Sequence, residues 1–346
     1  MNNKIKVAVL GCTGYTGLEL IYLLSNHSDV LINFLGSSSN KGKKISSFDK
    51  RLKNIKFPKI NNINEINYID YNVVFLALPH NISQNIIKDN FNKSIFIDLS
   101  ADFRLDNQKI YEKNYNNKHL CPKYLKNFTY GLAEINHSKI KKSKHIAVPG
   151  CYPTSILIPL IPLLKKNIIK SSNLIIDSKS GYSGAGKNFD MKNIFKDDQI
   201  NFYNYNTNKH RHMCEIKQEL EKVTKSNLNF SFNPHILPIY RGIMSTMYCD
   251  LNKKMKKKDI IEFLKDYYKQ NIFIKILDDK DRGDFFNVQN TNNCLIKVFE
   301  NYDNNKIILI SLIDNLIKGA AGQAIQCMNL IFDINEIKGL KFKKSA

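Results

Sequence analysis

The chain has 346 residues, 43% of them hydrophobic, which is enough for a large core and favours two domains over one. Lysine and arginine total 52 against 31 acidic residues, a formal charge of +21. Such a charge can indicate binding to nucleic acid. Here the lysines are scattered among asparagines and isoleucines, so a bias toward AT-rich codons explains the charge more simply, and we expect no nucleic-acid partner.

The hydrophobic pattern predicts no membrane span, because no uninterrupted apolar run approaches ~18 residues. A strand is predicted almost at the N-terminus, so we expect no signal peptide. The seven cysteines are scattered and show no CxxC pairs. This pattern is typical of reduced thiols, and we expect a cytoplasmic protein.

Strand-like and helix-like segments alternate over the first hundred residues. Short apolar runs predict four buried strands, at residues 5–10, 30–35, 73–78 and 95–99. Helical segments lie between them, at 18–24 and from about residue 82. This βαβ order predicts the α/β class, with a Rossmann-type doubly wound parallel sheet.

A glycine-rich turn with the spacing GxxGxxG follows the first strand and opens the first helix. Glycines allow the backbone to approach a pyrophosphate, and the helix N-terminus donates N–H groups to it. An ordinary turn is the alternative. We predict that a dinucleotide binds here, with contacts from Gly11, Thr13, Gly14, Tyr15, Thr16 and Gly17.

The second strand ends in a polar segment at residues 36–41. A site selective for NAD usually has Asp or Glu here, bonded to the ribose 2′-hydroxyl. This segment has no acid, and its hydroxyls and lysines suit a 2′-phosphate instead. We therefore predict NADP as the cofactor, contacted by Ser37, Ser38 and Lys41; a polar loop without cofactor contacts is the alternative.

Cys151 is the strongest candidate for a nucleophile. It follows a short apolar run and stands just before a helix predicted at about 153–164. Pro153 suits the first turn of that helix, and the positive end of a helix dipole favours the thiolate form of a cysteine. Together with the nucleotide-binding turn, this suggests covalent catalysis followed by hydride transfer. A buried structural cysteine is the alternative.

A second polar cluster, HRHMCE at residues 210–215, precedes a helix predicted at 214–223. A histidine can accept the thiol proton and later act as a general acid, while a carboxylate can orient the imidazole. We assign these roles to His212 and Glu215. Since no third ligand has a suitable local spacing, we expect no metal.

Two further segments carry groups suited to anionic substrates. The glycine- and hydroxyl-rich loop at 180–187 can hold a phosphate or carboxylate, and it lacks the spacing of a Walker loop. Arg241 follows Pro238-Ile239-Tyr240 in a tight turn and could clamp a carboxylate through two hydrogen bonds. A structural arginine is the alternative.

The pattern changes after Cys151. Strands are predicted at 174–179, 243–250, 294–299 and 306–313, and several successive strands with little helix between them favour a mixed or antiparallel sheet. The last predicted helix, 316–332, is rich in glycine and alanine. We expect an NADP-binding domain at 1–149, to which the segment 315–346 returns, and an α+β catalytic and oligomerisation domain at 150–314.

These motifs together resemble those of the N-acetyl-gamma-glutamyl-phosphate reductases of arginine biosynthesis, of the longer bacterial and plant type. The wider superfamily includes aspartate-semialdehyde and glyceraldehyde-phosphate dehydrogenases. The matching segments run in order over nearly the whole chain: GCTGYTG at Gly11, LALPH at Leu76, DLSADFRL at Asp98, YGLAEIN at Tyr130, VPGCYPTS at Val148, SGYSGAGK at Ser180, HRHMCEI at His210, PIYRGI at Pro238 and DNLIKGAAGQAIQ at Asp314.

The resemblance implies reduction of N-acetyl-glutamyl 5-phosphate by NADPH to the 5-semialdehyde and phosphate, through a thioester on Cys151. It implies a homodimer or homotetramer. It also implies substrate contacts from His210, Arg241, Ser183 and Arg104, and cofactor contacts from Ser183, Gly184 and Asn315.

The chain departs from the family pattern at two places. An arginine often follows the second-strand serine, whereas this chain has Ser39 and Asn40, so a lysine must pair with any phosphate there. A proline commonly precedes the glutamate of the histidine motif, whereas this chain has Cys214. Three alternatives stay open: a reductase for a longer, carrier-bound or aspartyl acyl phosphate, a cofactor-binding regulatory protein without catalysis, and, against the expectation from the scattered lysines, a nucleic-acid-binding protein.

Overall fold

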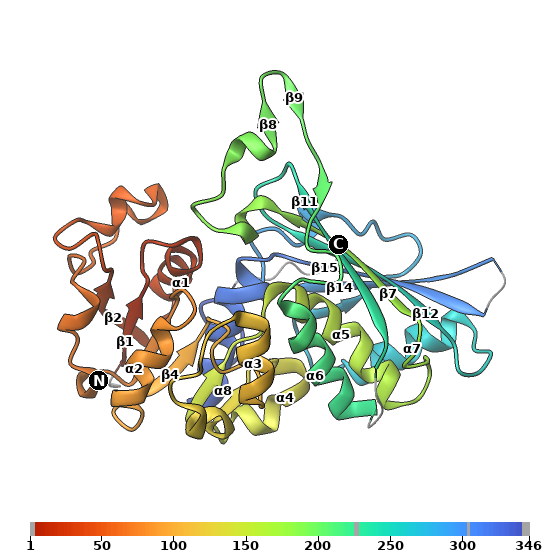
Figure 1. Ribbon diagram of the computed structural model, residues 1–346, viewed down its shortest axis with the longest axis horizontal. Coiled ribbons are helices and arrows are strands. Elements are labelled where there is room, and N and C mark those ends of the chain that lie inside the picture. The colour runs from red at the N-terminus through yellow and green to blue at the C-terminus, as the bar shows by residue number, and fades with distance from the viewer. Residues whose placement is uncertain (1–3, 225–227, 303–304, 341–346) are drawn as a thin grey trace. The chain divides into compact units, whose positions relative to one another are not determined.

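The computed structural model describes residues 4–224, 228–302 and 305–340. The chain divides into two compact units (Figure 1). The first runs to Pro149 and resumes at Ala320, and the second spans Gly150–Gly319. The first unit thus resumes within the segment predicted as one final helix, and residues 341–346 lie outside the described part.

The first unit is built on a six-stranded sheet in which all neighbouring strands are parallel, in the order β2-β1-β3-β4-β6-β5. Its strands are β1 (Ile5–Leu10), β2 (Val30–Gly36), β3 (Val73–Leu76), β4 (Ile95–Asp98), β5 (Phe128–Tyr130) and β6 (His145–Ala147). The strand order reverses at β1, as in doubly wound sheets that bind dinucleotides. The predicted fold class is therefore confirmed for this unit.

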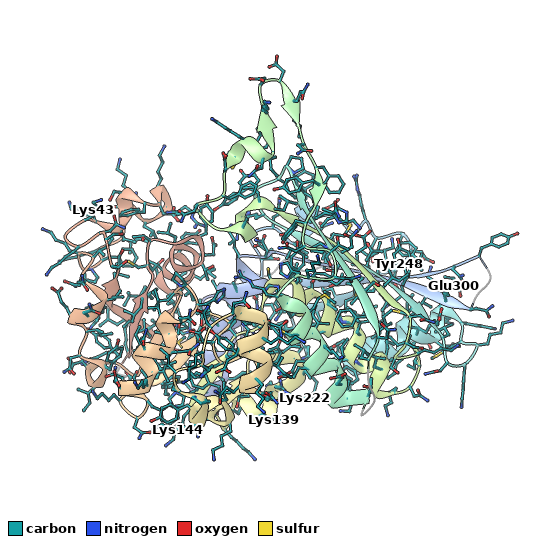
Figure 2. All side chains as sticks on the ribbon, in the orientation of Figure 1. Lys43, Lys139, Lys144, Lys222, Tyr248 and Glu300 are labelled. Atoms are coloured by element: carbon teal, nitrogen blue, oxygen red, sulfur yellow. The ribbon has the colours of Figure 1, made fainter. Side chains whose placement is uncertain are left out.

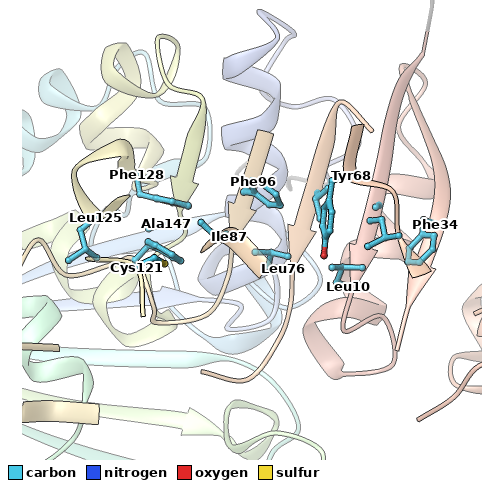
Figure 3. Close-up of a cluster of buried hydrophobic side chains, with 14 residues drawn as sticks. Leu10, Phe34, Tyr68, Leu76, Ile87, Phe96, Cys121, Leu125, Phe128 and Ala147 are labelled. Atoms are coloured by element: carbon cyan, nitrogen blue, oxygen red, sulfur yellow. The ribbon is translucent and has the colours of Figure 1, made fainter. Parts of the chain in front are cut away.

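Five α-helices accompany this sheet: α1 (Tyr15–Ser25), α2 (Ile82–Asn90), α3 (Gln108–Tyr115), α4 (Ala133–Ile140) and α8 (Gly322–Ile331). Helix α8 packs against α4 and α1. Figure 3 shows one buried cluster in which Leu10, Leu76 and Phe96 from successive strands meet Ile87 of α2. Burying each such side chain contributes about 1.5–3 kcal/mol, which explains why the strands are continuous apolar runs.

The second unit contains a seven-stranded mixed sheet in the order β10-β11-β7-β12-β15-β14-β13. Its strands are β7 (Leu174–Gly181), β10 (Tyr203–Asn204), β11 (Phe230–Leu237), β12 (Ile243–Asp250), β13 (Ile274–Ile276), β14 (Cys294–Glu300) and β15 (Lys306–Ile313). The β7–β11 and β13–β14 pairs are parallel and the others antiparallel, which confirms the mixed sheet. A separate hairpin, β8 (Phe195–Lys196) and β9 (Gln199–Ile200), projects from this unit (Figure 1).

The helices of the second unit are α5 (Cys151–Lys165), α6 (His212–Thr224) and α7 (Lys257–Tyr267), and α5 packs against α6, β12 and β15. The inner face of the sheet carries Ser178 and Ser245, whose hydroxyl oxygens lie 2.7 Å apart, and Ser155 of α5 reaches Ser245 at the same distance. On the outer face Ile175 and Tyr248 are register partners, 51% and 39% exposed; Figure 2 labels Tyr248. The sheet therefore has one covered face and one partly apolar open face.

Four helix starts differ from the sequence prediction. Helix α1 begins at Tyr15, three residues before the predicted start at residue 18. Helix α5 begins at Cys151 itself, not after it, and α6 begins at His212. The predicted final helix is two elements, a π-helical turn at Ile317–Ala321 followed by α8. Within the described ranges, no helix has the length and apolarity needed to cross a membrane.

Candidate active site

Cys151 is the first residue of α5, and its thiol is partly accessible. Gly150 is the N-cap, in an extended conformation. The backbone N–H of Gly150 donates a 2.9 Å hydrogen bond to Oε1 of Glu215, a fully buried residue in the first turn of α6. The carboxylate expected to orient His212 therefore also holds the residue before Cys151, the candidate nucleophile.

His210 and His212 lie side by side at the start of α6. Their ring centroids are 4.7 Å apart, and the backbone N–H of His212 donates to Nδ1 of His210 at 3.1 Å. Burial lowers the pKa of His210 to about 4, and the charge of Arg211 adds to this effect. His210 is therefore neutral near pH 7, with Nδ1 as acceptor and the proton on Nε2.

Two tyrosines that the sequence analysis did not single out complete this aromatic cluster. The rings of Tyr152 and Tyr205 pack edge-on against His210, with centroids 5.4 and 5.5 Å away. The Tyr205 hydroxyl donates to the Tyr152 hydroxyl at 3.2 Å, and that hydroxyl donates to the backbone oxygen of His235 at 3.3 Å. Burial raises the pKa of Tyr205 to about 12, so both stay protonated donors. Tyr152 follows Cys151 directly, but no spacing in the sequence marks Tyr205.

Arg241 forms a two-point ion pair with Asp314, which the sequence analysis also did not single out. Nε lies 2.7 Å from Oδ2, and Nη2 donates to Oδ1 at 3.0 Å, with both side chains buried. Nη1 donates to Oδ1 of Asn290 at 3.1 Å. Asp314 and Asn290 thus fix the plane of the Arg241 guanidinium.

Three predicted contact segments of the second unit meet at Asn315. Its Nδ2 donates to Oγ of Ser183 at 2.9 Å, and its Oδ1 accepts the backbone N–H of Gly242 at 2.7 Å. A Cβ on Gly184 would lie 3.8 Å from the same Nδ2 and 3.1 Å from Oγ of Ser180. The loop after β7, the turn before β12 and the segment after β15 are therefore fixed to one another.

The glycine-rich turn of the first unit needs glycine at two of its three positions. Gly11 has φ +80°, and a Cβ there would lie 2.1 Å from the backbone oxygen of Ala77. A Cβ on Gly17 would lie 2.2 Å from the backbone oxygen of Gly11, so α1 packs directly on the turn. Gly14, the N-cap of α1, has open space beyond a 3.5 Å contact. These features match a turn built to bring a helix N-terminus to a ligand.

The predicted 2′-phosphate segment contains one ion pair that the sequence did not reveal. Lys41 pairs with Glu65, an exposed residue of the next stretch of chain. Ser37 is buried and accepts a hydrogen bond from Nδ2 of Asn40 at 3.3 Å, while Ser38 is exposed. Lys41 therefore already has an anionic partner, which any phosphate must replace or share.

Arg104 lies buried in the first unit. Its Nε donates to the backbone oxygen of Val148 and its Nη2 to that of Leu99, both at 2.8 Å. Val148 stands three residues before Cys151 in the chain. These bonds fix the direction of the guanidinium relative to the backbone at Leu99 and Val148.

Apart from Cys214, which is also partly accessible and lies in the first turn of α6, the other cysteines are buried. Cys12, inside the glycine-rich turn, and Cys121 are buried, and burial raises the pKa of each to about 12. Across the three described ranges, no group of three or more His, Cys, Asp or Glu side chains could hold a metal ion.

Comparison with known proteins identifies both units. The family model "Semialdehyde dehydrogenase, NAD binding domain" matches residues 6–143, and "Semialdehyde dehydrogenase, dimerisation domain" matches residues 151–315. Among solved structures, aspartate semialdehyde dehydrogenase II from Vibrio cholerae has a TM-score of 0.72 at 16% identity, covering 95% of this chain and 99% of that one. The aspartate semialdehyde dehydrogenase solved with NADP from Candida albicans has a TM-score of 0.67 at 19% identity, covering 95% and 98%. These two show a shared fold.

Curated relatives are more similar and cover nearly the full chain. A protein named N-acetyl-gamma-glutamyl-phosphate reductase from Clostridium beijerinckii is 42% identical over 97% of this chain and 98% of its own length. One from Caldicellulosiruptor bescii is 44% identical with the same coverage. A probable chloroplastic one from Arabidopsis thaliana is 38% identical over 97% of this chain and 84% of its own length. The resemblance read from the motifs is thus confirmed: the chain belongs to the N-acetyl-gamma-glutamyl-phosphate reductase family of oxidoreductases.

Proposed function

We propose that this protein reduces N-acetyl-glutamyl 5-phosphate to N-acetyl-glutamate 5-semialdehyde with NADPH, releasing phosphate, through a thioester on Cys151. One observation carries the proposal. Cys151 begins α5, and the residue before it is hydrogen-bonded to Glu215 of α6, the helix that also begins with His212. A nucleophile at a helix N-terminus and an imidazole on the adjoining helix are the parts that acyl transfer through a thiolate requires.

In the acylation step the Cys151 sulfur attacks the carbonyl carbon of the acyl phosphate. A carbon–sulfur bond forms, the bond from that carbon to the phosphate oxygen breaks, and phosphate leaves with the electron pair. His212 takes the thiol proton beforehand, and its imidazolium stabilises the thiolate. Backbone N–H groups in the first turn of α5 point toward the oxyanion that develops.

The glycine turn and the start of α1 fit a dinucleotide, because Gly11 and Gly17 admit no side chain and Gly14 leaves the helix N-terminus open. The residues assigned to hold it are Gly11, Thr13, Gly14, Tyr15, Thr16, Gly17, Ser37, Ser38, Lys41, Ser183, Gly184 and Asn315. When bound, NADPH supplies the hydride that reduces the thioester carbon. The aldehyde forms as the Cys151 thiolate is expelled, and the imidazolium of His212 stabilises that thiolate.

Anionic parts of the substrate require cationic partners. We assign Arg104 to this task, since its guanidinium is buried and its direction is fixed by the backbone oxygens of Val148 and Leu99. Arg241 is also assigned to the substrate, with Asp314 fixing the plane of its guanidinium. Ser183, held by Asn315, supplies a hydroxyl in the second unit.

We propose a homodimer or homotetramer in the cytoplasm. The open face of the mixed sheet, with Ile175 and Tyr248, supports an assembly of copies, as does the description of the matching family model as a dimerisation domain. Light scattering during gel filtration tests it, and a monomeric mass at micromolar concentration would exclude it.

The reaction is tested in reverse, with N-acetyl-glutamate 5-semialdehyde, phosphate and NADP, by following nicotinamide absorbance. Parallel runs use NAD and aspartate semialdehyde. We expect turnover with the acetylated substrate and NADP, and no turnover by Cys151→Ser, which should still bind NADPH. Turnover by Cys151→Ser would exclude the thioester, and preference for aspartate semialdehyde would favour the aspartyl alternative.

A further inference from the structure

The turn that follows β15 is π-helical over Ile317–Ala321. The backbone N–H of Gly319 donates to the oxygen of Asp314 at 3.0 Å, a bond that spans five residues. A π-helical turn adds one residue to a helical path and so changes which residue faces a neighbour; such turns are often found at functional sites. Here the residue turned toward the nucleophile is a glycine.

Gly319 lies directly against Cys151. A Cβ built on Gly319 would be 2.7 Å from Cβ of Cys151 and 3.1 Å from its Cα. Real Cβ contacts below 3.0 Å essentially do not occur. The atoms met are the backbone carbon and first side-chain carbon of Cys151, which no change of rotamer can move away. Any side chain at position 319 must therefore displace either the turn or the nucleophile.

The turn itself is firmly braced. Asp314, fully buried, accepts the backbone N–H groups of Leu316 at 2.9 Å and Ile317 at 3.2 Å through Oδ1. The same carboxylate holds Arg241 at two points and accepts the N–H of Asn290 at 2.7 Å. Because the first residues of the turn are anchored in this way, strain introduced at Gly319 passes to Cys151.

We propose that Gly319 is a positioning residue, which fixes the Cβ of Cys151 and thereby aims the thiolate along the N-terminus of α5. The inference rests on the proposed function, since it concerns the cysteine that would carry the acyl group. It adds a contact that the chemistry of the motif does not require: Glu215 holds the residue before Cys151, and the bare backbone of Gly319 packs against Cys151 itself.

The first test compares Gly319→Ala with Gly283→Ala. Gly283 is a matched control in the same unit, because its Cβ would meet only the side-chain tips of Leu277 and Leu312, at 3.3 and 3.4 Å. The readout is the rate of alkylation of Cys151 by iodoacetamide as a function of pH, followed by peptide mass spectrometry. Buried Cys12 and Cys121 should react far more slowly at neutral pH because burial raises their pKa values.

We expect Gly319→Ala to slow alkylation of Cys151 at least tenfold and to lower kcat at least as much, with the dissociation constant of NADPH within twofold of the parent. For Gly283→Ala, the alkylation rate of Cys151, kcat and the dissociation constant of NADPH should all lie within twofold of the parent values. An unchanged alkylation profile in folded Gly319→Ala would overturn the proposal. If alkylation slows while the parent shows no reductase activity, the positioning contact stands and the proposed function fails.

A double-mutant cycle keeps the test decisive if Gly319→Ala folds poorly. Cys151→Gly removes the Cβ that a methyl group added at Gly319 would strike, so the loss of thermal stability caused by Gly319→Ala should shrink by at least half in the Cys151→Gly background. This cycle needs no substrate. Equal losses in both backgrounds would show that the two residues do not press on each other, and would overturn the proposal.

Discussion

The backbone N–H of Gly150 is bonded to Oε1 of Glu215 at 2.9 Å, so the helix that bears His212 also holds the residue that precedes Cys151. Both partners are buried. A buried N–H group left without an acceptor costs about 1–3 kcal/mol. One carboxylate therefore serves two purposes, the seating of α5 and, as proposed, the orientation of the imidazole.

Substitutions at Glu215 separate these two purposes. Glu215→Gln keeps an oxygen for Gly150, so its free energy of unfolding should stay near that of the parent, while Glu215→Ala should lose about 1–3 kcal/mol. The loss of charge in Glu215→Gln should still slow acylation about tenfold, since an amide stabilises an imidazolium less. Unfolding in guanidinium chloride measures the free energy of unfolding, and pre-steady-state kinetics measure the rate of acylation. Equal destabilisation by Glu215→Gln and Glu215→Ala would show that the hydrogen bond to Gly150 does not stabilise the start of α5.

His210 should act through its hydrogen bond and not through its charge. His210→Asn can place Oδ1 where Nδ1 now accepts the N–H of His212, whereas His210→Ala leaves the start of α6 uncapped and should cost about 1 kcal/mol of stability. Since burial holds the pKa of His210 near 4, the acidic limb of the kcat/KM profile above pH 5 should be the same for His210→Asn and the parent. A shifted limb would show that His210 titrates in the reaction.

The pairing of Lys41 with Glu65 should weaken NADP binding. If Lys41 contacts the 2′-phosphate, Lys41→Gln should lower NADP affinity about fivefold, near 1 kcal/mol, and leave NAD affinity unchanged. Glu65→Gln frees the lysine and should tighten NADP binding about twofold at low salt, with the gain fading as salt rises. Titration of both nucleotides into each variant measures this, with NAD as the internal control. Equal effects on NADP and NAD would remove Lys41 from the phosphate site.

Asp98 should make the protein less stable as the pH rises. Burial, together with the neighbouring charge of Asp102, raises the pKa of Asp98 to about 7. The folded state thus keeps a proton that the unfolded chain releases near pH 4, so folding takes up a proton and stability falls from about pH 4 to about pH 7.

Asp98→Asn removes this titration. We expect the loss of unfolding free energy between pH 5 and pH 8 to be roughly 1–3 kcal/mol smaller in Asp98→Asn than in the parent. Asp89→Asn, at an exposed aspartate of α2, is the control and should follow the parent. Unfolding in guanidinium at both pH values gives the comparison, and parallel pH dependences of the parent and Asp98→Asn would refute the assignment.

Local pattern was sufficient for much of the fold. The predicted strands at 5–10, 243–250 and 306–313 match β1, β12 and β15 residue for residue, because each is an apolar or alternating run with clear breaks at its ends. Strand β11 was not foreseen, since Pro234 and its polar neighbours interrupt its pattern, yet it pairs with β7 over its whole length. A tertiary partner on each side overrides the weak local signal.

In the candidate site, too, some features follow from the local sequence and others depend on contacts between distant residues. Cys151, His212 and Glu215 could be chosen from residue type and local order, but the bond from Glu215 to Gly150 joins residues 65 apart in the sequence. Nor does any local signal predict a π-helical turn at Ile317–Ala321, because its extra residue is fixed by the carboxylate of Asp314 and by close packing on Cys151. The residue types suited to catalysis can be predicted from local motifs, whereas the contacts that orient these residues join parts of the chain that are far apart in the sequence.

Helix α8 returns to the first unit, where Gln323 and Cys327 both donate to the backbone oxygen of Gly131 and Asn329 meets the ring of His27. During translation, these partners leave the ribosome only after the entire second unit has been made. Chains usually fold from the N-terminal domain onward. Here the first unit cannot complete its packing until α8 is made, and until then the surface that α8 covers stays exposed to solvent. We expect chains truncated before Gly322 and released from the ribosome to carry a protease-resistant second unit and a protease-sensitive first one.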